Sequence, residues 1–257
     1  MIRWLRPTLL LIAAATAGLL LLRDPAPAEA LAASPPVLAA PAAQAPAAVA
    51  VVPPPEASSP KVTVALNDAI LRILATYGSA EGHPYAWQRG RDTDGVTQEL
   101  FWRGTLLAAP EAGGGIHCSG ITFEVYLRAL AEVVGEEHGP DVETLLAMKN
   151  TWYVRDGDTQ GPVDALVKAG LGLRRKGLAE FQPGDIVQFW RNNGKGHSVV
   201  FINHTWNSDG SLRGMIYWSA QGTSGGVGMR RTSPGPDINQ IAPGRLYGVS
   251  PIWTPGG

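Results

Sequence analysis

The only cysteine of this 257-residue chain lies between a glycine-rich run and an apolar, helix-like pattern. Cys118 follows residues 113–117 (GGGIH) and precedes Ser119. At the first turn of a helix, free backbone N–H groups and the helix dipole stabilise a thiolate and lower the pKa of the thiol. The amide of Cys118 or Ser119 could also donate to an oxyanion during acyl transfer. A structural cysteine is expected inside an apolar run instead, so we interpret Cys118 as a reactive nucleophile.

A thiol nucleophile needs a general base, which in enzymes is normally a histidine. Among the five histidines, His197 opens an apolar run at residues 198–202 after a polar loop that contains glycine. A ring at this place is held by a strand and remains reachable from a loop. A purely structural histidine would fit the position equally well. His197 is therefore the candidate base, whereas the others lie in loops or near element ends: His83, His117, His138 and His204.

Composition argues against several other kinds of function. The chain has 21 Lys and Arg against 22 Asp and Glu, and no basic cluster forms a stripe, so nucleic acid and anionic membrane surfaces are not expected partners. No histidine pair has zinc-ligand spacing. Residues 92–95 (DTDG) resemble the start of a calcium loop but lack its later ligands, and we interpret them as a surface turn. We expect no cofactor and no metal.

The first 61 residues have the composition of a targeting segment followed by a tether. Arg3 and Arg6 precede an apolar run over residues 8–22, which is shorter than the ~20 residues of a membrane span. Small residues with cleavage-site spacing follow, so residues 1–30 are predicted to be a signal peptide, with an uncleaved anchor as the alternative. Residues 31–61 are rich in Ala and Pro and are predicted to be a disordered linker. The protein is therefore expected to be exported, periplasmic or extracellular, with residues 62–257 as its folded domain.

Periodicity predicts helices first and strands afterwards. Helical spacing of apolar residues begins near residue 66 and ends at Gly78, and a second helix is expected from Cys118 or Ser119 to about residue 134. Residues 79–115, between these helices, are predicted to be a long irregular segment with a functional role. The remaining elements expected are helices at 141–150 and 162–168 and strands at 186–190, 197–206 and 214–220. A turn signal at residues 207–211 joins the last two strands, so the fold class is α+β.

Four short motifs, taken in chain order, resemble those of the NlpC-type cell-wall cysteine peptidases, a compact relative of the papain fold. The motifs are Gly82-His83-Pro84-Tyr85-Ala86-Trp87, His117-Cys118-Ser119-Gly120, Pro183-Gly184-Asp185-Ile186-Val187 and His197-Ser198-Val199-Val200. The resemblance covers residues 65 to 250. It implies a compact papain-like domain with N-terminal helices packed on an antiparallel β-sheet. It also implies that Cys118 attacks an acyl carbon, that His197 activates it, and that Tyr85 helps to bind the oxyanion.

The family's third catalytic residue is polar and lies on the strand after the histidine strand, where it orients the imidazole. Pairing about a turn near Asp209 places residues 219–221 opposite His197, with Ser219 and Gln221 on one face. Either could be the orienting residue. Two tryptophans, Trp87 and Trp218, flank the expected site and are candidates to stack on a sugar or peptide.

Two departures from the family pattern concern substrate recognition. The family's aspartate before the cysteine, which binds a free peptide amine in many members, is His117 here, and the segment from Trp87 to Cys118 is longer. His117, as a candidate substrate-binding residue, would not attract an ammonium group, so we expect a substrate without a free amine beside the cleaved bond. The alternative is that its ring merely hydrogen-bonds a loop carbonyl.

Together these residues predict an exported cysteine hydrolase that cleaves an amide bond in peptidoglycan, within the stem peptide or at its junction with the sugar. The expected partner is peptidoglycan or another envelope amide, with no membrane contact beyond the N-terminal segment. Two alternatives stay open. One is an acyl-transferring or toxin-like relative on the same fold, and the other is a non-catalytic module that binds the envelope.

Overall fold

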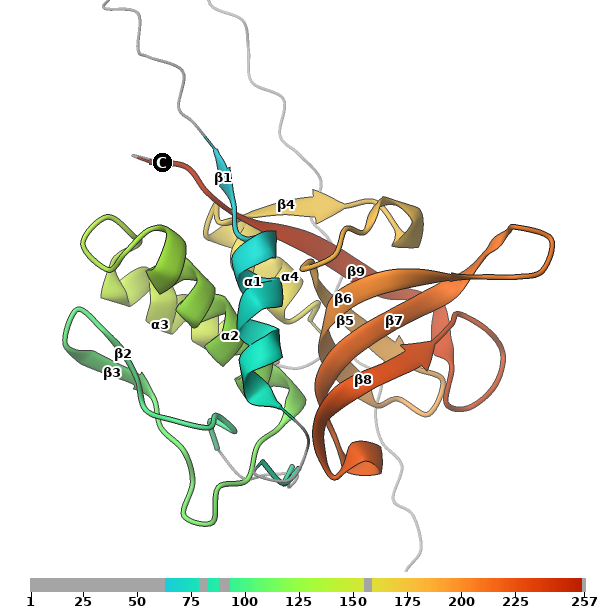
Figure 1. Ribbon diagram of the computed structural model, residues 1–257, viewed down its shortest axis with the longest axis horizontal. Coiled ribbons are helices and arrows are strands. Elements are labelled where there is room, and N and C mark those ends of the chain that lie inside the picture. The colour runs from blue at the N-terminus through green and yellow to red at the C-terminus, as the bar shows by residue number, and fades with distance from the viewer. Residues whose placement is uncertain (1–62, 79–82, 88–92, 155–158, 256–257) are drawn as a thin grey trace, which may run out of the picture. The chain divides into compact units, whose positions relative to one another are not determined.

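The computed structural model places helices beside a curled antiparallel sheet (Figure 1). It describes residues 63–78, 83–87, 93–154 and 159–255. The signal peptide and linker predicted for residues 1–61 lie outside these ranges, so both stay predictions. The described residues belong to one compact unit, and no helix among them is long and apolar enough to span a membrane.

Four α-helices occur in the described residues, as the periodicity predicted, and local sequence explains their ends. The helices are α1 Asn67–Leu74, α2 Cys118–Val133, α3 Val142–Trp152 and α4 Pro162–Lys168, with a 3₁₀ turn, η1 Ala75–Tyr77, after α1. Gly78 has a positive φ of 62° where η1 ends. The Asp141 side chain accepts the Thr144 N–H at 2.6 Å and caps α3. Pro162 occupies the first turn of α4, where a missing N–H costs nothing.

All strands of the main sheet pair antiparallel, which confirms the α+β class. The spatial order is β1-β9-β5-β6-β7-β8, with β4 also paired to β9. Their bounds are β1 Val64–Ala65, β4 Gly172–Arg175, β5 Ile186–Arg191, β6 Gly196–Trp206, β7 Leu212–Gln221, β8 Gly226–Thr232 and β9 Ile241–Trp253. The three predicted strands correspond to β5, β6 and β7.

The segment predicted to be irregular contains a small hairpin, which corrects that expectation. Strands β2 Leu100–Trp102 and β3 Thr105–Ala108 pair with each other and form a separate sheet. Arg103 and Gly104 connect them with φ values of 48° and 74°. Two consecutive residues with positive φ are typical of the tight turns whose twist matches a β-hairpin.

Side chains of the sheet divide between two apolar clusters, one against the helices and one inside the curl of the sheet. Val200 and Trp218 belong to the cluster that also contains the buried faces of α1 and α2. Val199, Phe201 and Tyr217 belong to the second cluster. Because side chains alternate along a strand, His197 shares the face of Val199 and projects toward the second cluster.

A buried carboxylate ties the loop before β2 to α2. Glu124, fully buried on α2, accepts the Tyr77 hydroxyl at 2.8 Å, and it also accepts the Thr97 backbone N–H at 2.7 Å and the Thr97 hydroxyl at 2.6 Å. Burying a carboxylate is costly unless hydrogen bonds replace its water. Here they do, and the same bonds hold η1 and the loop against the middle of α2.

Candidate active site

His117 caps the helix that begins at Cys118. Its backbone is extended (φ −140°, ψ 168°), and its Nδ1 accepts the Gly120 N–H at 3.2 Å. Because Nδ1 accepts, the proton of a neutral ring lies on Nε2, which donates to the Thr93 carbonyl 3.0 Å away. The residue is 5% exposed. These are the contacts of a structural cap, and the substrate-binding role of His117 stays a prediction.

The first turn of α2 is held between two neighbouring segments. A Cβ on Gly120 would lie 2.0 Å from the Asp94 carbonyl oxygen, so that chain passes directly over the turn. Just before the helix, Ile116 exchanges backbone hydrogen bonds with Pro84 and Ala86 at 3.0 and 2.9 Å. This pairing brings Tyr85, which lies between them, beside the segment that carries Cys118.

Burial raises the pKa of the Cys118 thiol above its ordinary value, although the side chain is partly exposed. Hydrogen bonds from the Ser198 backbone and the Ser119 hydroxyl oppose this effect without overcoming it. The expectation that the helix N-terminus lowers the thiol pKa is therefore wrong for the resting protein. Desolvation of the thiolate outweighs the hydrogen bonds that favour it.

A row of polar side chains runs from Cys118 into the sheet. Cys118 Sγ lies 4.0 Å from Ser119 Oγ, which lies 3.4 Å from Ser198 Oγ, and Ser198 donates to Gln188 Oε1 at 2.6 Å. Because the Ser198 proton is used on Gln188, Ser198 can only accept, and the single Ser119 hydroxyl proton serves either Ser198 or Cys118 Sγ. The Ser119 hydroxyl proton is thus engaged, which leaves the backbone N–H as this residue's donor for an oxyanion. That role stays a prediction.

His197 is 4% exposed and lies in an aromatic cage. Its ring packs edge-on to Phe189 and Tyr217, with centroids 5.5 and 5.7 Å away. Its Nε2 is 3.3 Å from Gln221 Oε1. Of the two candidate orienting residues, only Gln221 contacts the ring in this way, because the Ser219 hydroxyl donates to the Ser198 carbonyl at 2.8 Å.

The resting His197 is neutral. Burial, and then the positive charge of Arg191, lower the pKa of the imidazole to about 3, against a smaller opposite effect of Gln221.

Helix α2 packs against β6 and β7, which brings the elements of Cys118 and His197 together (Figure 1). No hydrogen bond joins Sγ to the imidazole among the described residues. The structure therefore shows a neutral thiol and a neutral imidazole, and not an ion pair.

The aromatic candidates lie in different environments. Burial raises the pKa of the Tyr85 phenol, and so does the proximity of Cys118, which places the phenol within electrostatic reach of Sγ. Trp87 is 55% exposed and has free surface for a ligand. Trp218 is 4% exposed and packs on Tyr77 at 5.3 Å between ring centroids, as a core residue does. Stacking of either tryptophan on substrate stays a prediction.

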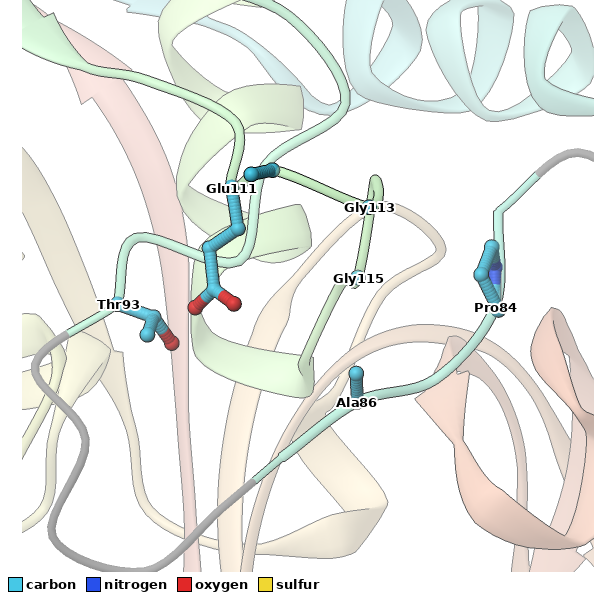
Figure 2. A pocket seen from close by; sticks show the side chains of 7 residues that line it. Pro84, Ala86, Thr93, Glu111, Gly113 and Gly115 are labelled. Atoms are coloured by element: carbon cyan, nitrogen blue, oxygen red, sulfur yellow. The ribbon is translucent and has the colours of Figure 1, made fainter.

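A pocket of about 200 Å³ lies beside the nucleophile segment (Figure 2). The Glu111 side chain points into it, and its Oε1 is buried with no hydrogen-bond partner among the described residues. Gly115 is required in the wall, since a Cβ there would lie 2.4 Å from the Ala86 Cβ. The lining residues are Pro84, Ala86, Thr93, Glu111, Ala112, Gly113 and Gly115. Four of these residues lie three to seven positions before Cys118 in sequence, and Pro84 and Ala86 flank Tyr85.

No metal centre is formed by the described residues, which contain no group of three or more His, Cys, Asp or Glu side chains suited to a metal ion. In the segment that resembles a calcium loop, Asp94 forms an ion pair with Lys149 at 2.5 Å and accepts the Ala109 N–H at 3.0 Å. Asp92 lies outside the described ranges. The observed contacts of Asp94 are those of a loop anchor.

Four polar residues of this region were not predicted from the sequence: Gln188, Arg191, Ser198 and Tyr217. For Tyr217 a signal was available, because it lies on the same face of its strand as Ser219 and Gln221. Searches with this chain found no matching protein-family model, no matching curated protein and no matching solved structure.

Proposed function

We propose that this protein is an exported cysteine hydrolase with a papain-like arrangement, which cleaves an amide bond of peptidoglycan. The observation that supports it most is the state of His197. The ring is buried and neutral, and Nε2 is engaged by Gln221, so Nδ1 is the nitrogen left to accept a proton. The His197 ring lies on the face opposite the helices, and the backbone hydrogen bond from the next residue, Ser198, to Cys118 is what brings the thiol close to this strand. A neutral base with one free nitrogen beside a thiol is what thiol catalysis needs.

The reaction begins with proton transfer from the thiol to Nδ1 of His197 as Sγ of Cys118 attacks the amide carbon. The backbone N–H of Cys118 or Ser119 and the hydroxyl of Tyr85 donate to the oxyanion that forms. Since its pKa is raised, the Tyr85 phenol stays protonated and able to donate. The imidazolium then gives its proton to the departing amine, leaving a thioester. Water, deprotonated by His197, hydrolyses the thioester and restores the thiol.

Three features support an envelope substrate. Residues 1–30 have the pattern of an export signal, and residues 31–61 that of a tether. The four motifs resemble those of cell-wall peptidases. The recess beside Cys118 and the exposed Trp87 offer space and an aromatic surface for part of a stem peptide or sugar.

The test is digestion of purified sacculi by the mature protein, with released fragments identified by mass spectrometry. Cys118→Ser and His197→Ala should each abolish release, and the double variant should be hardly worse than either, because residues of one catalytic unit are non-additive. His138→Ala, at an exposed histidine, is the matched control and should act like wild type. If Cys118→Ser still released fragments from sacculi, the cysteine-hydrolase proposal would be wrong.

A non-catalytic envelope-binding module is the second candidate, and one observation favours it. The thiol and the imidazole are both neutral and share no hydrogen bond, so nothing in the resting site shows activation. Such a module would sediment with sacculi equally well as wild type and as Cys118→Ser, and neither protein would release fragments.

A further inference from the structure

Three hydrogen bonds connect four side chains from neighbouring strands at the candidate base. Arg191 Nη2 donates to the Tyr217 hydroxyl at 3.4 Å, and that hydroxyl donates to Gln221 Oε1 at 3.0 Å. The same oxygen lies 3.3 Å from His197 Nε2. Arg191 also lies over the Phe189 ring, 5.1 Å from its centroid. The chain of contacts thus begins at a cation and ends at the imidazole.

The direction of each hydrogen bond follows from Arg191, the first residue in this chain of contacts. A guanidinium can only donate, so the Tyr217 oxygen accepts from Arg191 and its own proton points to Gln221. Gln221 must then present its carbonyl oxygen, since a turned amide would leave the hydroxyl proton buried without an acceptor. A carbonyl oxygen facing His197 requires the ring proton on Nε2. Nδ1 is left with a lone pair.

Among the described residues, the Gln221 side chain makes no other hydrogen bond that would fix the orientation of its amide. Its Nε2 is buried and has no hydrogen-bond partner among the described residues. The oxygen and the NH₂ group of the amide are similar in size. The oxygen can accept from a protonated Nε2 of His197, and the NH₂ group can donate to an unprotonated one. The Tyr217 hydroxyl is therefore the group that distinguishes the two orientations.

We propose that Tyr217 and Arg191 are positioning residues that set the tautomer of His197 through Gln221. This inference rests on the proposed role of His197 as base, since only then does the free nitrogen matter. Neither residue needs to touch the substrate. Removing the Tyr217 hydroxyl releases the amide to turn, and a turned amide stabilises the Nδ1–H tautomer, which cannot accept the thiol proton.

The direct test is Tyr217→Phe, which keeps the ring that packs on His197 and Phe189. In ¹⁵N-histidine-labelled wild type, long-range ¹H–¹⁵N spectra should show the Nε2–H tautomer alone for His197. Tyr217→Phe should show both tautomers. Its kcat on sacculus fragments should fall roughly 3- to 10-fold, the range that one neutral hydrogen bond sets, with KM changed less than about twofold.

Tyr126→Phe is the matched control, because its hydroxyl is also buried but has no partner among the described residues. It should leave both the spectrum and kcat unchanged. Arg191→Lys keeps a cationic donor and should retain more of the wild-type tautomer than Arg191→Met. A single Nε2–H tautomer in Tyr217→Phe would overturn the inference. The spectra need no activity, so failure of the proposed hydrolase reaction would be seen separately, in wild type.

Discussion

His117 Nδ1 accepts the N–H of Gly120, and this bond satisfies one of the free donors at the start of α2. Aspartate, the residue that the resemblance expects at this position, is also a good helix cap. Replacing His117 by aspartate therefore changes the charge beside Cys118 while keeping a capping group. The two possible roles of this position, capping and substrate recognition, can be separated by substitution.

His117→Ala should lower the free energy of unfolding by roughly 1 kcal/mol, the usual cost of a lost cap, and His117→Asp by less. On paired substrates, wild type should prefer the acetylated amine, and His117→Asp should shift the preference toward the free amine. Denaturant titration measures the first effect, and kcat/KM on the two substrates the second. A wild-type preference for the free amine would show that the substrate expectation is wrong.

Loss of the Gln221 side chain should mainly lower kcat, whereas loss of the Ser219 hydroxyl should mainly lower stability. Gln221→Ala removes the group that holds the His197 ring, and kcat should fall about 10- to 100-fold with a small change in stability. Ser219→Ala removes a buried hydrogen bond to the Ser198 carbonyl, so it should cost about 1 kcal/mol of stability and leave kcat within about threefold. The opposite pattern would make Ser219 the orienting residue.

Cys118 should alkylate slowly at neutral pH. Because burial raises the thiol pKa, its thiolate fraction at pH 7 is lower than that of a free cysteine, whose pKa is about 8.5. The rate with iodoacetamide, followed by mass spectrometry against pH, should therefore rise only in more alkaline solution than for free cysteine. A faster reaction than free cysteine at neutral pH would indicate a thiolate–imidazolium pair.

Stability should fall in acid because of His197. The ring titrates near pH 6.5 in the unfolded chain, and its pKa is lowered to about 3 in the folded protein. Between these values the unfolded state binds more protons, so the free energy of unfolding decreases as pH falls through this window, by a few kcal/mol in total. His197→Gln should flatten the decrease in urea titrations between about pH 4 and 7. Parallel curves for the two proteins would contradict the prediction.

Two glutamates on α2 offer a comparison of buried and exposed charge. Glu124→Gln should destabilise the protein by about 2 to 4 kcal/mol, because an amide nitrogen would face donors that now share a carboxylate. Glu132 pairs with Arg72, and both side chains are largely exposed, so Glu132→Gln should cost less than about 1 kcal/mol. Thermal unfolding measures both. Equal losses would mean that the Glu124 bonds do not hold the loop.

The helices were predictable because their ends have local causes, such as the Asp141 cap and Pro162. The hairpin β2–β3 was missed because the long glycine-rich segment hid a short Arg103-Gly104 turn. Strand β9 contains Pro243 and Pro251, which argue against a strand in sequence. In the sheet the backbone of Pro251 is used only as an acceptor, from Leu66 N–H.

The position of the orienting residue was predictable, but its identity was not. Counting back from the turn near Asp209 aligns His197 with Gln221, and β6 and β7 pair Val200 with Trp218 in that same register. Two irregularities in the ladder cancel each other, so the count from the turn still applies. A sequence pattern does not show which of Ser219 and Gln221 contacts His197. The answer depends on the length of each side chain and on the Ser198 carbonyl, which binds the Ser219 hydroxyl. The raised thiol pKa likewise depends on packing of distant segments.

Strand β9 has a consequence for how the chain reaches its folded state. It pairs with β1, β4 and β5, and its residue Trp253 lies opposite Val64. Until residues 241–253 emerge from a ribosome, β5 presents an open edge and two strands have no partner. Contacts so distant in sequence also form slowly. We therefore expect the main sheet to close only after residues 241–253 are available to pair with β1, β4 and β5.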